Sequence, residues 1–190
     1  MPNLDAQTAD AQQAREVRVL GLIGTAHFLS HFYILALPPL FLMWRDEFHV
    51  SFATLGLASA LLSGTTALLQ TPVGFLTDKY GAKLFLVGGT LLMSLGIAGM
   101  AIAPAFWMIL VLCVISGIGN SVIHPVDYAI LAGSIDKARM GRAFAFHTFT
   151  GNLGFAAGPP VIVLLAGLMG WRGAIGLVGL VGVPVVGAIL

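Results

Sequence analysis

The chain has 190 residues, of which 58% are hydrophobic and 9% are charged, and its net charge is +1. Soluble domains carry roughly 25% charged residues, and a chain this short must still cover any core with polar surface, so the composition excludes a soluble protein. The small net charge also excludes a nucleic-acid-binding protein. We therefore predict an all-α integral membrane protein with the lipid bilayer as its main partner.

The apolar stretches predict six transmembrane helices. Residues 1–17 are polar and lack the pattern of a signal peptide, so we expect a disordered or surface-lying cytoplasmic tail there. Crossing a hydrocarbon core takes about 20 apolar residues in a helix. Six stretches meet this requirement, at about residues 19–43, 52–76, 84–103, 105–132, 143–169 and 174–190.

The basic residues between these stretches predict the orientation. With the amino terminus inside, the outer segments hold only Arg45 and Arg172. The inner segments hold the other seven basic residues, Arg15, Arg18, Lys79, Lys83, Lys137, Arg139 and Arg142. Cytoplasmic segments of membrane proteins are enriched in lysine and arginine. We therefore expect the amino terminus to be cytoplasmic.

The segment 74–83 reads Gly-Phe-Leu-Thr-Asp-Lys-Tyr-Gly-Ala-Lys and resembles the signature loop of the major facilitator superfamily, which joins spans two and three. It departs from that pattern at Ala82, where a second basic residue is usual. The residues that match are Gly74, Asp78, Lys79, Gly81 and Lys83. We expect Gly81 to permit a tight turn and Asp78 to accept hydrogen bonds from backbone donors at a helix start.

The fifth stretch carries a second resemblance. Its Gly154, Gly158 and Pro159 are similar to the Gly-x-x-x-Gly-Pro motif of antiporters and drug exporters in the superfamily. Small residues spaced in this way let membrane helices pack closely, and the pair of prolines at 159–160 predicts a kink. This segment could be only a kink that serves helix packing, whereas the resemblance to the family implies that it belongs to an interface that moves during transport.

Two further segments, 69–74 and 117–125, resemble the fosmidomycin-resistance-type exporters of the superfamily. Superfamily members often carry a buried arginine in the fourth span, where this chain has Cys113. A proton-coupling role therefore cannot be carried over from that arginine.

The resemblance implies the amino-terminal half of a major-facilitator fold, a six-helix bundle built from 3+3 inverted repeats. Spans one to three and spans four to six share a weak order of features, such as Pro72 in the second span and Pro160 in the fifth, which agrees with a repeat. The second half would be a missing carboxy-terminal half, another copy or a partner chain. The implied location is a bacterial inner (plasma) membrane.

Ionisable and amide side chains inside the spans are the candidates for a transport site. Asp127 is the only acidic residue in a predicted span. An acidic residue at such a position faces a cavity or a polar partner, or it lies near enough to the end of the span to reach the membrane–water interface. We give these two alternatives equal weight. The cavity or proton-linked candidates are His27, His31, Asn120, His124, Asp127, His147 and Asn152. For a single histidine, the alternative role is hydrogen-bonded packing.

These features predict secondary transport of a small solute by alternating access. A cluster of His27, His124, Asp127 and His147 on the cytoplasmic side would suit proton-linked efflux, because histidine titrates near neutral pH. Histidine and aspartate side chains could also bind a divalent first-row metal ion. These side chains lie on different helices, however, and we predict no metal and no cofactor. A non-transporting scaffold or regulatory subunit is the alternative function. An enzyme is not expected, because Ser63 and Ser116 lack the sequence context of an intramembrane protease.

Overall fold

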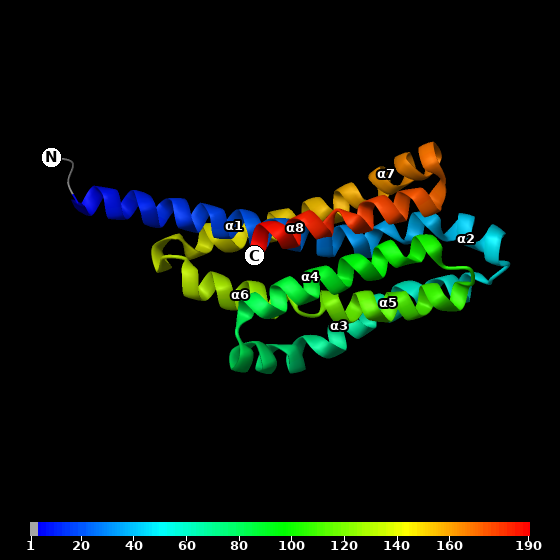
Figure 1. The fold of residues 1–190 in the computed structure, drawn as a ribbon, viewed down its shortest axis with the longest axis horizontal. Coiled ribbons are helices and arrows are strands. Elements are labelled where there is room, and N and C mark those ends of the chain that lie inside the picture. Colours follow the sequence, from blue (N-terminus) through cyan, green and yellow to red (C-terminus); the bar gives the residue numbers. More distant parts are fainter. Residues whose placement is uncertain (1–3) are drawn as a thin grey trace.

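The computed structural model describes residues 4–190, and these form an all-helical bundle whose long helices run along one axis (Figure 1). The α-helices are α1 (Leu4–Ala36), α2 (Phe41–Phe48), α3 (Phe52–Tyr80), α4 (Ala82–Gly99), α5 (Phe106–Asn120), α6 (Ile123–Ser134), α7 (Met140–Leu180) and α8 (Gly182–Ile189). Three short 3-10 helices are η1 (Pro38–Leu40), η2 (Met100–Ile102) and η3 (Lys137–Arg139).

Five helical segments among the described residues are long and apolar enough to cross a membrane. They are Asp10–Phe48, Phe52–Tyr80, Ala82–Ile102, Phe106–Ser134 and Lys137–Ile189. The last has 53 residues, far more than one crossing needs. Inside it Gly170 leaves the helical region, with φ 73° and ψ 164°, and the chain reverses there (Figure 1). A positive φ of this kind favours glycine, which has no Cβ.

The reversal at Gly170 is tied to the first span by hydrogen bonds. Glu47 accepts one from Trp171 Nε1 and one from Arg172 Nη2, both at 2.6 Å. Arg172 Nη1 also donates to the carbonyls of Ala101 and Ala103, both at 2.9 Å. This end of the bundle is therefore joined across three parts of the chain.

The helical segment that contains the first predicted span is longer than that span at both ends. Helix α1 begins at Leu4, so most of the expected tail is helical, as its alanine and glutamine content favours; residues 1–3 lie outside the described residues. The expected polar break at 44–47 is also helical, within α2. Trp44 is fully buried there and packs edge-on against Trp171, with ring centroids 5.9 Å apart.

The predicted fourth span is two helices, α5 and α6, separated at Ser121 and Val122. Pro125 has no backbone N–H to donate to the carbonyl of Ser121, so the regular helical ladder is interrupted at this point. The interruption directly precedes His124 and Asp127. In contrast, helix α7 keeps helical backbone angles through Pro159 and Pro160.

The helices approach closely where glycines face a neighbouring backbone. In α5, a Cβ added to Gly119 would lie 2.6 Å from the Gly89 carbonyl oxygen and against the backbone nitrogen of Met93, both in α4. In lipid, such packing of small residues drives helix association. The contact therefore fixes α5 against α4.

We expect Gly119→Ala to lower the free energy of unfolding by about 1–3 kcal/mol, because the added methyl group cannot fit without separating α4 and α5. The loss of stability is measured as a lower melting temperature of the purified protein in detergent. Gly88→Ala is the matched control, since a Cβ at Gly88 meets nothing within 4 Å. Equal melting temperatures for the two variants would contradict the close contact.

Candidate functional site

Four histidines and one aspartate meet inside the bundle, where α1, α6 and α7 lie together. His27 and His31 come from α1, His124 and Asp127 from α6, and His147 from α7. The ring centroid of His27 lies 4.3 Å from that of His31, 5.0 Å from that of His124 and 3.7 Å from that of His147. We call these five residues the histidine cluster.

Asp127 is held in this cluster by His147. The side chain of Asp127 is 0% exposed and that of His147 is 3% exposed, and His147 Nε2 lies 3.0 Å from Asp127 Oδ2. The structure thus places the carboxylate inside the bundle and not at its surface. A carboxylate buried in this way needs a polar partner, because lipid offers none, and His147 supplies it.

His27 is oriented by the backbone of α7. Its Nδ1 lies 2.8 Å from the carbonyl oxygen of His147 and donates to it, since a carbonyl can only accept. The two rings stack, with an interplanar angle of 10°. This contact leaves Nε2 of His27 as the nitrogen without a proton when the ring is neutral.

Several buried polar atoms of the cluster have no hydrogen-bond partner among the described residues. They are His27 Nε2, His31 Nδ1, His124 Nδ1 and Asp127 Oδ1. Buried polar atoms are nearly always hydrogen-bonded in proteins, so four orphans in one place mark a site that can accept protons or a cation.

Two aromatic residues that the sequence analysis did not select border the cluster. Phe155 lies against His31, with centroids 4.1 Å apart. Tyr128 lies 5.6 Å from His147 and 6.1 Å from His124, measured between ring centroids. The spacing of Tyr128, four residues after His124, was a signal that could have placed it on the same face.

Asn120 belongs to a different polar network. Its Oδ1 accepts a hydrogen bond from Ser30 at 2.5 Å, and its Nδ2 donates to Thr66 Oγ1 at 3.3 Å. Asn120 is 2% exposed. Sequence reasoning missed Ser30 and Thr66, although Ser30 lies three residues after His27 in an apolar helix, where a polar side chain is a signal. Asn152 is exposed on α7 and does not join either group.

The signature-loop residues lie at the junction of α3 and α4. Gly81 has φ 95° and makes the turn, and Gly74 packs near Pro125, where an added Cβ would lie 3.7 Å from that of the proline.

The expected capping role of Asp78 is wrong: the residue before α4 is Gly81, and no side chain caps the start of α4. Helix α3 continues to Tyr80, so Asp78 lies in its last turn and is exposed. Lys79 and Lys83 are also exposed.

Gly154 and Gly158 bring α7 onto α1, and the two helices run side by side (Figure 1). A Cβ added to Gly154 would meet the carbonyl of Phe28, and one added to Gly158 would lie 2.8 Å from the carbonyl oxygen of Phe32. Pro159 follows within the same continuous helix. These residues bring the backbones of α1 and α7 together next to the histidine cluster.

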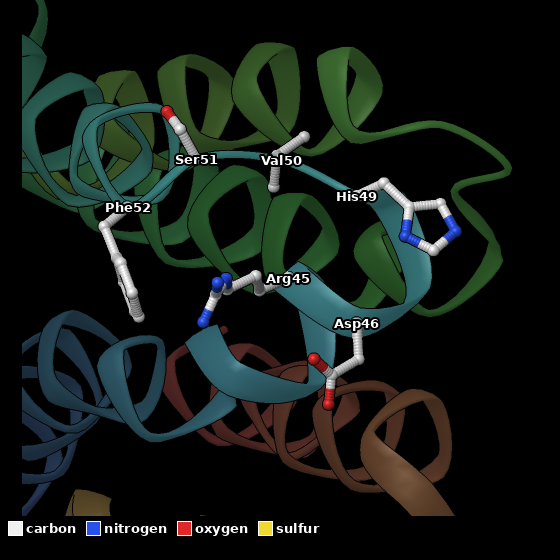
Figure 2. Close-up of a pocket in the computed structure, with 6 residues that line it drawn as sticks. All are labelled: Arg45, Asp46, His49, Val50, Ser51 and Phe52. Carbon is white, nitrogen blue, oxygen red and sulfur yellow. The ribbon is translucent and has the colours of Figure 1, made fainter.

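A large surface hollow of about 750 Å³ lies elsewhere, at the link between α2 and α3 (Figure 2). The guanidinium of Arg45 lies over the ring of Phe52, 4.6 Å from its centroid, and His49 points away from the bundle. The other lining residues are Asp46, Val50 and Ser51. The hollow is open and its charged residues are exposed, so it has none of the burial that distinguishes the histidine cluster.

Comparison with known proteins identifies the family. Residues 22–190 match the model of the Major Facilitator Superfamily. The MFS-type transporter YfnC of Bacillus subtilis (strain 168) is 29% identical over 157 residues, which cover 83% of this chain and 38% of that protein. The fosmidomycin resistance protein of Escherichia coli (strain K12) is 31% identical over 144 residues, which cover 74% of this chain and 34% of that protein.

A third relative, the multidrug resistance protein MdtH of Aeromonas hydrophila, is 29% identical over 126 residues, which cover 66% of this chain and 32% of that protein. This chain therefore spans only 32–38% of the length of these three relatives. The family match extends over nearly all of the described residues, and the relatives are named as transporters or resistance proteins. The chain is an integral membrane protein that belongs to the major facilitator superfamily of transporters.

Proposed function

We propose that this chain forms the amino-terminal half of a secondary active transporter that exports a small solute by alternating access, with export linked to protons. The observation that carries the proposal is the buried contact between Asp127 and His147 in a chain of this family. Transporters of this kind place their coupling and substrate sites deep in the membrane, between repeated helical units. The histidine cluster would be such a site, because it joins three helices inside the bundle.

Six crossings follow if the reversal at Gly170 divides the last helical segment into two. Its two arms run in opposite directions in Figure 1, and residues beside the turn bind Glu47 and the end of η2. Six crossings would form two units of three, as in 3+3 inverted repeats. With seven basic residues expected inside and two outside, the amino terminus would face the cytoplasm of a bacterial inner membrane.

The proton would be shared between Asp127 and His147. His147 on α7 contacts Asp127 directly, and the other titratable groups around His147 are His27 and His31 on α1 and His124 and Tyr128 on α6. All nine lysines and arginines lie outside the predicted spans, so no fixed positive charge there neutralises the carboxylate. A proton bound at this pair would do so, and its release would recharge the site.

The names of two relatives support export of a small solute. One is named a fosmidomycin resistance protein and another a multidrug resistance protein, which favours export of small solutes. A non-transporting scaffold or regulatory subunit is the alternative, and it requires none of the cluster's chemistry.

We expect Asp127→Asn to abolish export that is driven by a proton gradient, because the amide cannot gain and lose a proton at this site. Cells that express the full-length protein are compared for survival in fosmidomycin, the compound named in one relative. Asp46→Asn is the matched control, since Asp46 is an exposed carboxylate outside the cluster (Figure 2). Unchanged survival for Asp127→Asn would refute proton linkage, and no protection by the parent protein would favour the scaffold.

We expect the mature protein to be roughly twice the 19.8 kDa of this chain or more, because a complete transporter of this family needs a second bundle. An antibody against residues 1–17 detects its size on a denaturing gel of native membranes. A band at the size of this chain would contradict a covalently joined second half. The second bundle would then be another copy or a partner chain.

A further inference from the structure

We infer that His27, His124 and His147 form a binding site for a divalent first-row transition-metal ion, with Zn²⁺ as the ion to test. One ring nitrogen from each residue lies within 4.8 Å of those of the other two. The three residues come from α1, α6 and α7. Neutral imidazole is a preferred ligand for zinc, copper and nickel, and the sequence alone could not show that these rings converge.

The hydrogen bonds of the cluster leave the correct atoms available for a metal. His27 donates from Nδ1 to a backbone carbonyl, so its Nε2 presents a lone pair. His147 contacts Asp127 through Nε2, so its Nδ1 presents one. Metal-binding histidines nearly always donate their second nitrogen to a carboxylate or a backbone carbonyl in this way. Two of the three rings therefore already have the outer partners that metal ligands need.

The unpartnered atoms point to the same conclusion. His27 is 3% exposed, yet its Nε2 has no hydrogen-bond partner among the described residues, and neither does Nδ1 of His124. Three tetrahedral nitrogen ligands around zinc lie about 3.4 Å apart, given a Zn–N distance near 2.0–2.1 Å. The rings would thus close by roughly 1 Å on binding. Each lone pair would then gain a partner.

The charge of the site also suits a cation. When it is ionised, Asp127 contributes one negative charge beside the three rings, and its Oδ1 has no hydrogen-bond partner among the described residues. The lysines and arginines lie outside the predicted spans, so they do not repel a cation from this position. A fourth ligand would be water or a substrate group, as in zinc sites with three protein ligands.

This inference goes beyond the proposed function, since binding of a metal requires neither transport nor a second bundle. It is tested by titrating Zn²⁺ against a chromophoric chelator and the purified protein in detergent, with a purification tag that contains no histidine. We expect one saturable equivalent of Zn²⁺ per chain. Absence of saturable binding to the parent protein would overturn the inference.

Variants show whether the binding belongs to the cluster. His124→Gln removes one ligand, and Asp127→Asn weakens the support of His147; we expect each to reduce Zn²⁺ affinity by about tenfold or more. His49→Asn is the matched control, because His49 is exposed at the α2–α3 link and points away from the bundle (Figure 2). It should bind as the parent does.

The elution volume of each variant in size-exclusion chromatography shows that it is folded. If His124→Gln does not fold, Asp127→Asn decides the outcome. Equal affinities for the folded cluster variants and His49→Asn would assign the zinc to another place and refute the site.

Discussion

The contact between Asp127 and His147 is the interaction on which the candidate site depends. A carboxylate inside a membrane protein is costly unless a polar group meets it, and here the two side chains are 0% and 3% exposed and lie 3.0 Å apart. The backbone carbonyl of His147 in turn orients His27. A single residue of α7 therefore positions partners from both α6 and α1, which explains why three helices meet at one polar point.

The packing of the helices is what makes this contact possible. Gly154 and Gly158 let α7 approach the backbone of α1, and in lipid such close contact replaces the hydrophobic driving force of soluble proteins. Pro125 interrupts the fourth span just where His124 and Asp127 begin to face inward. Loss of regular helix is tolerated at this depth because neighbouring protein, not lipid, surrounds it.

Much of this arrangement could be predicted from the residues. Composition identified the membrane class, and the Gly74–Lys83 segment identified the family that the comparisons confirm. The role expected for Asp78 was wrong because α3 continues to Tyr80, inside the signature motif, so Asp78 lies in the last turn of one helix and not at the start of the next. The partners of Asn120 were missed for a similar reason: Ser30 and Thr66 are 90 and 54 residues away in sequence. Periodicity shows the face on which a side chain lies but not what it meets.

The most direct test of the account is a double-mutant cycle on Asp127 and His147. Unfolding free energies in detergent are measured for the parent, Asp127→Ala, His147→Ala and the double variant. Hydrogen bonds between membrane helices contribute about 0.6–1.7 kcal/mol in such cycles, and we expect a coupling energy in this range. A cycle of Asp127 with the exposed His49 should give none. Zero coupling for Asp127 and His147 would show that the buried contact does not exist in the folded protein, and the candidate site would fall with it.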